Sequence, residues 1–216
     1  MTKTNSAARV TEHINRRTTQ SIFRAFDYGI EIGRPLNMYA VIHLRETAHR
    51  TAPELFREIR HKFRDWLNYR TRKEGERVPP SYVETFENPN GNPHVNWVVH
   101  VPEHLQDEFR KKLPMWVERV QGTVQPSDID VQQVKAPYAK RLAKYIVKGT
   151  QPEFIEHFYL HDVHEPQGRV VGKRAAVSIA LGPTARGRDG FRPRRRRGTW
   201  AQRAAAAAPE QRPASL

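Results

Sequence analysis

The sequence predicts an α+β domain in which helices pack on an antiparallel sheet of about five strands. Two observations support this fold class. Segments with strand periodicity and segments with helix periodicity alternate along residues 35–182, and two neighbouring strand segments are joined by a turn-forming stretch, which indicates a central hairpin. The predicted order of elements is β-α-β-β-α-β-α-β.

The first strand and the first helix of this order lie before residue 75. Residues 36–44 are apolar and β-prone, and Pro35 marks their start. Thr51, Pro53 and Glu54 then form a typical helix entry, with threonine as the N-cap and proline and glutamate in the first turn. Apolar residues at helical spacing follow, so an amphipathic helix is predicted over about residues 52–72.

The hairpin comes next. Residues 81–87 and 94–101 have the composition of strands, and residues 88–93 (NPNGNP) have the composition of a turn. A helix is predicted to open at Pro102, and a short strand is expected within residues 124–134.

The last helix and the last strand complete the domain. A helix is predicted from Pro137 to about Lys148, with Gly149 at the position of a C-cap. A final strand is expected within residues 169–181. This places a domain over residues 35–182, preceded by a segment at 1–34 that is compatible with a short helix. Residues 183–216 are rich in Arg, Pro, Gly and Ala and are expected to be largely disordered.

Composition excludes several classes of site. The 216 residues include no cysteine, so a disulfide framework, a thiolate zinc site, an iron–sulfur cluster and a cysteine nucleophile are all excluded. No apolar run approaches the roughly 20 residues that span a bilayer, and the N-terminus lacks the apolar region of a secretory signal. We therefore expect a cytoplasmic location and no membrane partner.

The charge predicts a polyanionic partner. Lysine and arginine total 37 against 23 acidic residues, a formal charge of +14. The tail at 183–216 holds nine arginines against Asp189 and Glu210. The run from Arg194 through Arg195 and Arg196 to Arg197 is interpreted as a phosphate binder without sequence preference, and the alternative is a solvated solubility tail.

A candidate metal site lies on the hairpin. Side chains alternate on a strand, so His94 and Asn96 share one face and can converge on one ion. Glu87 ends the preceding strand across the turn and can supply a carboxylate. One imidazole with two oxygen donors favours Mg²⁺ or Mn²⁺ over zinc. The alternative is that these side chains are ordinary polar residues near a turn.

A candidate nucleophile lies on the last helix. Tyr145 and Lys148 are three residues apart and share a helix face, and Tyr138 lies near the same face. A phenol attacks effectively only when its oxyanion is stabilised, and a nearby lysine provides that. The reaction that suits such a group is attack on a phosphodiester to give a phosphotyrosine. The alternative is that Tyr145 packs in the core and the lysines are solvated.

Further basic residues are candidates for contact with a nucleic-acid backbone. The segment 167–174 (QGRVVGKR) combines two glycines with Lys173 and Arg174. On the tyrosine helix, Arg141 and Lys144 add positive charge beside the candidate nucleophile.

The order of these motifs resembles the HUH endonucleases, and within them the small rolling-circle replication initiators of bacterial plasmids and phages. HVNWVVHVP is similar to the family's metal-binding strand, RLAKYIVKG to its tyrosine helix, and QGRVVGKR with LGPTAR to its C-terminal region. The resemblance covers about residues 35–186. Asn96 stands where the family usually has a second histidine. An amide oxygen is a weaker donor, so weaker metal binding or a degenerate site is expected.

The resemblance implies a specific activity. His94, Asn96 and Glu87 would hold a divalent ion that polarises the scissile phosphate, and Tyr145 would attack it to leave a free 3′-hydroxyl and a 5′-phosphotyrosyl link. Lys148 would stabilise the phenolate or orient the metal site. The substrate would be single-stranded or hairpin origin DNA. The 3′-hydroxyl would prime replication by a host polymerase, with unwinding by a host helicase.

Two rival functions stay open at this point. One is a non-catalytic DNA- or RNA-binding protein on the same scaffold, with Asn96 marking the loss of metal binding. The other is a mobilisation relaxase or transposase that uses the same chemistry, although a relaxase is more often a larger protein.

Overall fold

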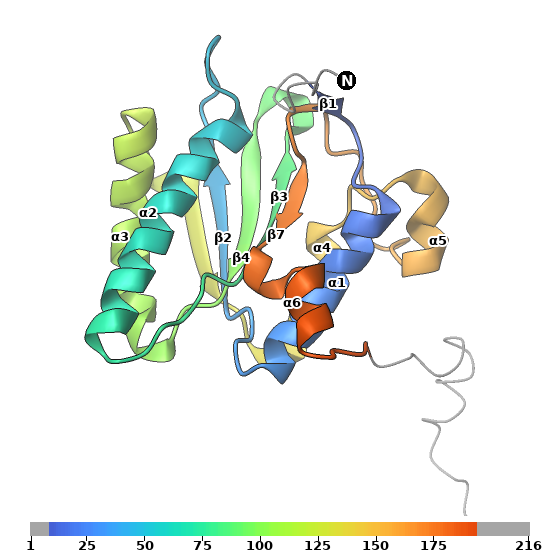
Figure 1. Cartoon of the computed structure of the whole chain (residues 1–216). Coiled ribbons are helices and arrows are strands. Elements are labelled where there is room, and N and C mark those ends of the chain that lie inside the picture. Colours follow the sequence, from blue (N-terminus) through green and yellow to red (C-terminus); the bar gives the residue numbers. More distant parts are fainter. Residues whose placement is uncertain (1–8, 194–216) are drawn as a thin grey trace, which may run out of the picture.

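The computed structural model describes residues 9–193 and has the predicted α+β architecture, with helices on both faces of one sheet (Figure 1). The sheet has five antiparallel strands in the order β5-β2-β4-β3-β7. Its central strand β4 (His94–Val99) lies between β2 (Met38–His43) and β3 (Tyr82–Glu87). The edge strands are β5 (Ile129–Gln133) and β7 (Ala175–Val177).

One face of the sheet forms the larger core with two long helices, α2 (Ala52–Lys73) and α3 (Gln106–Gln121). Trp97 of β4 is fully buried at its centre, and its ring meets those of Phe56 and Phe63 edge-on at 5.3 and 5.0 Å. Alternation along β4 sends Val95, Trp97 and Val99 to this face. The alternate residues His94, Asn96 and Val98 therefore point to the opposite face.

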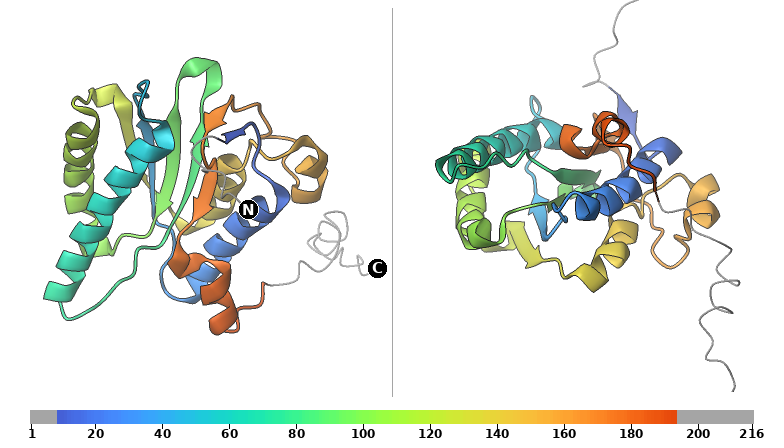
Figure 2. Two further views of the ribbon diagram at one scale, coloured as in Figure 1. Left: turned by 45° about the horizontal axis from the view of Figure 1, so that its top comes forward. Right: turned by 60° about the horizontal axis from the view of Figure 1, so that its bottom comes forward.

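The opposite face is covered by α1 (Arg16–Glu31), α4 (Ala139–Ile146) and α6 (Pro183–Arg188), as Figure 2 shows. The short helix α5 (Ile155–Phe158) follows α4 in the chain. Ile22 and Phe26 of α1 and Ile146 of α4 are buried in a second core with Val83 and Val98 of the sheet. The face that carries His94 is thus partly closed by helices.

The folded unit extends beyond the predicted boundaries of 35 and 182. α1 lies in the segment 1–34 and contributes to the second core. On the other side, α6 falls in the tail that was expected to be disordered, where the guanidinium of Arg186 donates to the backbone and hydroxyl oxygens of Ser21. The ring of Phe191 lies 5.1 Å from that of Tyr28. These contacts order the chain to at least Phe191.

The expected last strand at 169–181 is two strands. β6 (Val170–Val171) pairs with β1 (Val10–Thr11) in a separate ribbon, and β7 joins the main sheet. Gly172, at φ +106°, makes the turn between them. The helix predicted over 137–148 is shorter than expected, because α4 ends at Ile146 with Val147 as its C-cap. Gly149 is therefore not the cap.

Residues 167–174 fasten the hairpin from outside. Arg174 is 3% exposed and donates to the carbonyl oxygens of Phe86, Gln167, Thr11 and Gly168. Gly149 packs directly on the Gln167 side chain. These contacts hold the end of β3, where Glu87 lies, in a fixed position. No helix within residues 9–193 is long and apolar enough to cross a membrane.

Candidate functional site

The sheet and α4 bring the predicted site residues together. Glu87 and His94 are directly opposed across the β3–β4 pair, and Glu87 Oε2 lies 3.0 Å from His94 Nε2. The same carboxylate oxygen lies 3.2 Å from Lys148 Nζ, just beyond the end of α4. Glu87 is 3% exposed. Its buried carboxylate is balanced by two partners, the His94 imidazole and the Lys148 ammonium.

Lys148 connects this carboxylate to the candidate nucleophile. Its ammonium donates to the Tyr145 hydroxyl at 3.4 Å and lies 4.5 Å from the centre of the tyrosine ring. Burial alone would lower the pKa of Lys148, but Glu87 and then Tyr145 outweigh that effect, so its pKa is raised. The lysine therefore remains a cation at neutral pH beside a phenol that is 41% exposed and open to a substrate.

Asn96 lies deeper in the same face. It is 1% exposed, and its Oδ1 accepts a hydrogen bond from the Tyr39 hydroxyl at 2.5 Å. Burial, followed by the nearby Tyr145 and Glu87, raises the pKa of Tyr39, which keeps this hydroxyl a donor. Asn96 Nδ2 has no hydrogen-bond partner in the described protein, and the same is true of the hydroxyl of Thr85, its neighbour across the β3–β4 pair.

The donor chemistry of this cluster is compatible with a hard divalent ion. Glu87 and His94 already converge. A half-turn of the Asn96 amide would place its oxygen where the unpartnered Nδ2 now lies, while the Tyr39 hydroxyl could accept from the nitrogen. Within residues 9–193, no group of three His, Asp or Glu side chains is placed to hold a metal. An ion bound here would therefore need the Asn96 amide oxygen as a ligand, and the Glu87 carboxylate would contact both the ion and the Lys148 ammonium.

His43 belongs to this site, although no local sequence pattern selects it. It is the cross-strand partner of His94, and the two imidazole rings lie 5.3 Å apart. Only the strand register brings them together, since the two residues are 51 positions apart in the chain. The strand pattern of residues 36–44 contained this histidine, but the pairing of β2 with β4 was not predictable from it.

The predicted DNA-binding residues have different environments. Arg141 lines a pocket beside Tyr145, and the Lys144 ammonium donates to the Tyr159 carbonyl oxygen at 2.9 Å. Arg174 is buried and bonded to backbone carbonyls, so its place in the structure is that of an internal clamp and not of a surface contact. The four arginines at 194–197 lie outside the described residues.

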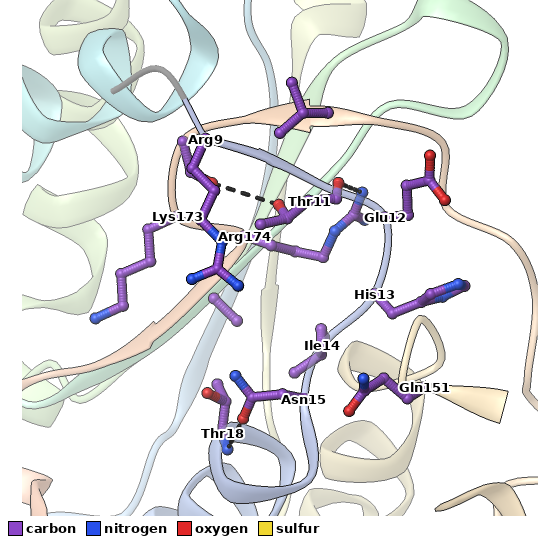
Figure 3. A pocket seen from close by; sticks show the side chains of 13 residues that line it. Arg9, Thr11, Glu12, His13, Ile14, Asn15, Thr18, Gln151, Lys173 and Arg174 are labelled. Carbon is purple, nitrogen blue, oxygen red and sulfur yellow. Dashed lines mark hydrogen bonds between the residues drawn. The ribbon is translucent and has the colours of Figure 1, made fainter. Parts of the chain in front are cut away.

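Lys173 lines a basic pocket of about 540 Å³ at the β1–β6 ribbon. Figure 3 shows it with Arg9, His13 and Arg174 around the N-terminal segment where that segment passes residues 172–175. Arg9 and His13 come from the segment to which the sequence assigned no chemistry. Apart from Glu12, the charged and titratable side chains that line this pocket are basic, which suits an anionic ligand.

The sequence was also compared with models of known protein families and with curated proteins. Neither comparison finds a significant match.

Proposed function

We propose that this protein is a DNA strand-nicking and strand-transfer enzyme that uses Tyr145 as its nucleophile, as a rolling-circle replication initiator does. One observation carries the proposal: Tyr145, Lys148, Glu87 and His94 form a continuous series of contacts on one sheet face, and Tyr145 at its outer end is exposed. A phenol next to a buried, charge-paired lysine is suited to attack on a phosphodiester.

The chain's own residues support each part of this reaction. The Tyr145 oxygen forms a bond to phosphorus while the bond from phosphorus to the 3′-oxygen breaks, and the 3′-oxygen takes up a proton. The phenol proton leaves to solvent, because the hydroxyl is exposed. The Lys148 ammonium stabilises the phenolate, and Glu87 holds the ammonium in place. Reversal of the same step rejoins a strand.

A divalent ion, when bound by Glu87, His94 and Asn96, would supply Lewis-acid polarisation of the scissile phosphate. The fixed position of Glu87 between His94 and Lys148 supports its role in orienting both the imidazole and the ammonium.

The substrate we propose is single-stranded or hairpin DNA at an origin. The basic pocket at Arg9 and Lys173 and the positive charge of Arg141 on α4 give two anion-attracting regions near the site face. The arginine run at 194–197 would add affinity that does not depend on base sequence. A host polymerase and a host helicase would complete replication.

The test is an adduct assay. Labelled single-stranded and hairpin oligonucleotides are incubated with Mn²⁺ or Mg²⁺, and the products are separated on a denaturing gel. Wild type is expected to give a band with protein covalently attached to the 5′ end of the cleaved strand. Tyr145→Phe is expected to give none, while the matched control Tyr159→Phe, also an exposed tyrosine of this region, keeps the activity.

Two outcomes would contradict the proposal. Adduct formation by Tyr145→Phe would mean that another residue, with Tyr138 the next candidate, is the nucleophile. Absence of any adduct from wild type over a range of origin hairpins and metals would favour a DNA- or RNA-binding protein without catalysis. The engaged oxygen of Asn96 is the observation that favours this second function. Gain of activity by Asn96→His would show that the ion site is weakened and not lost.

A further inference from the structure

A second pocket lies directly against the candidate nucleophile. Its volume is about 460 Å³, within the range of small-ligand sites. It is formed by the end of edge strand β5, the segment that follows, and α4. Tyr145 is part of its wall, so a group that fills the pocket lies against the residue that we propose as the nucleophile.

The lining has the composition of a site for a flat, polar ring. Tyr39, Tyr138 and Tyr145 provide aromatic surface, Gln132 provides an amide, and Arg141 provides a cation. Tyr138 is 60% exposed, and no aromatic neighbour within the described residues stacks on its ring. An aromatic side chain that is left open at the rim of a pocket can stack on a nucleobase.

The edge of the sheet gives this pocket a polar wall. Asp130 and Gln132 are two residues apart on β5, so their side chains share one face of the sheet. They pair with Val41 and Tyr39 of β2, and Val41 pairs with Asn96, so this is the face that carries Asn96. The Gln132 amide nitrogen donates to Asp130 at 2.6 Å, which leaves the Gln132 carbonyl oxygen available as an acceptor. A base with an exocyclic amino group, which is adenine, cytosine or guanine, has a donor that matches it, whereas thymine has no amino group.

We propose that this pocket binds the nucleobase next to the scissile phosphate, with Tyr138 as the stacking surface and Gln132 selecting a base with an exocyclic amino group over thymine. The inference rests on the proposed function, because it takes Tyr145 to be the reacting group. It adds a specificity determinant that is separate from the phosphate contacts. Cleavage would then depend on the identity of one base beside the nicked bond.

The test measures binding and not cleavage. The protein carries Tyr145→Phe, which keeps the ring and removes the nucleophile, and binding of fluorescein-labelled dA10, dC10 and dT10 is followed by anisotropy. Tyr138→Ala is expected to weaken binding of dA10 and dC10 about tenfold, since one stacking contact is lost. Tyr138→Phe is expected to stay within about twofold, because the ring that stacks is kept. Tyr69→Ala, which removes an exposed tyrosine of α2 on the other side of the sheet, is the matched control and should change nothing.

An oligonucleotide of abasic sites separates base contacts from phosphate contacts. If Tyr138→Ala weakens its binding as much as that of dA10, or if Tyr138→Ala and Tyr69→Ala behave alike, the base subsite is wrong. Gln132→Leu should reduce the preference for dA10 and dC10 over dT10, and an unchanged preference would refute the selectivity.

The two proposals can fail separately. Base binding that depends on Tyr138, in a protein whose wild type forms no adduct, would keep the subsite and overturn the nicking activity. Adduct formation that does not depend on Tyr138 or on base identity would keep the nicking activity and overturn the base subsite.

Discussion

Lys148 has the most connected side chain in the site. Its ammonium contacts Glu87 and Tyr145 and lies 3.6 Å from Glu165, which is itself exposed. Removing the Lys148 ammonium would leave the buried Glu87 carboxylate with His94 as its remaining partner. A buried charge that loses its counter-ion destabilises the folded state. The residue thus combines a proposed catalytic role with a structural one, and the two can be separated by experiment.

Lys148→Met is expected to lower the free energy of unfolding by about 2 kcal/mol at neutral pH, because the aliphatic stem is kept and only the ammonium is lost. Urea denaturation measures the effect. Lys144→Met is the matched control. Its ammonium makes a hydrogen bond to the Tyr159 carbonyl at the surface, so a smaller loss is expected. Equal losses for the two variants would contradict the role of the Glu87 pair.

The same comparison has a defined pH dependence. The pKa of Lys148 is raised in the folded protein above its ordinary value of 10.5, so folding favours the protonated form. The difference in stability between wild type and Lys148→Met should therefore be constant from neutral pH up to that ordinary value, where Glu87 is ionised. It should decline as the pH rises through the folded pKa. A difference that already declines as the pH rises from about 7 to about 9 would show that the ammonium is not stabilised by Glu87.

At the scale of elements, the hairpin of β3 and β4 is the scaffold of the site, and the segment 167–174 holds it. Gly168 is essential to that contact. Its φ is +66°, and a Cβ at this position would lie 1.9 Å from the carbonyl oxygen of Asn88, in the turn after β3. The backbone of Asn88 in turn donates to the Gln167 carbonyl at 2.8 Å. Two loops distant in sequence therefore touch backbone to backbone.

Gly168→Ala is expected to destabilise the protein much more than Gly122→Ala. Gly122 also has a positive φ of +83°, but a Cβ there would meet open space, so its cost is that of the left-handed conformation alone, about 1 kcal/mol. Gly168→Ala adds a backbone clash and should cost at least about 3 kcal/mol. Thermal or urea denaturation of the two variants tests this, and similar values would mean that the two loops separate easily.

The elements that the sequence predicted well are those with strong local signals. The capping box at Thr51 and Glu54 and the apolar stripe that follows define α2 to within a residue. The alternation in β3 and β4 was equally clear, and it placed Glu87 opposite His94 as the structure does. Helix spacing predicted that Tyr145 and Lys148 share a face, and a contact between them is observed at 3.4 Å.

What the sequence did not reveal depends on contacts between distant segments. The register of β2 against β4 selects His43, and packing of α1 on the sheet makes residues 16–31 part of the domain. Arg174 looked like a surface cation, because a buried arginine that donates only to carbonyl oxygens has no local sequence signal. The spacing predicts Gly149 as a helix cap, whereas in the structure its lack of a side chain lets Gln167 pack closely against it.

For the whole molecule, the C-terminal region has two separable parts. Residues 183–193 contain α6 and Phe191, which pack on α1 through Tyr28 and Ser21. Residues 194–216 carry the run of four arginines and lie outside the described structure. Stability should therefore depend on the first part, and electrostatic attraction to DNA on the second.

Two truncations test this division. Ending the chain after Gly182 is expected to lower stability by about 3 kcal/mol, because it removes buried Ala185 and the Arg186 bonds to Ser21. Ending it after Pro193 should leave stability unchanged but make the dependence of log K on log salt shallower by about 2 to 3, as expected for the loss of three or four phosphate contacts on a single strand. Equal salt slopes for full-length and truncated protein would refute the proposed role of the arginine run.

The way the site is assembled also has a consequence during synthesis of the chain. Both neighbours of β4 precede it, so Glu87 and His94 can meet once the first hundred or so residues have left the ribosome. Tyr145 and Lys148 emerge later, and the segment that follows α4 is fixed against α1 through the buried hydroxyl pair of Thr19 and Thr150, 2.9 Å apart. If Tyr145 is the nucleophile, the nascent chain would pass most of its translation unable to attach itself to DNA. Reactivity would then begin only after about the first two thirds of the protein have emerged.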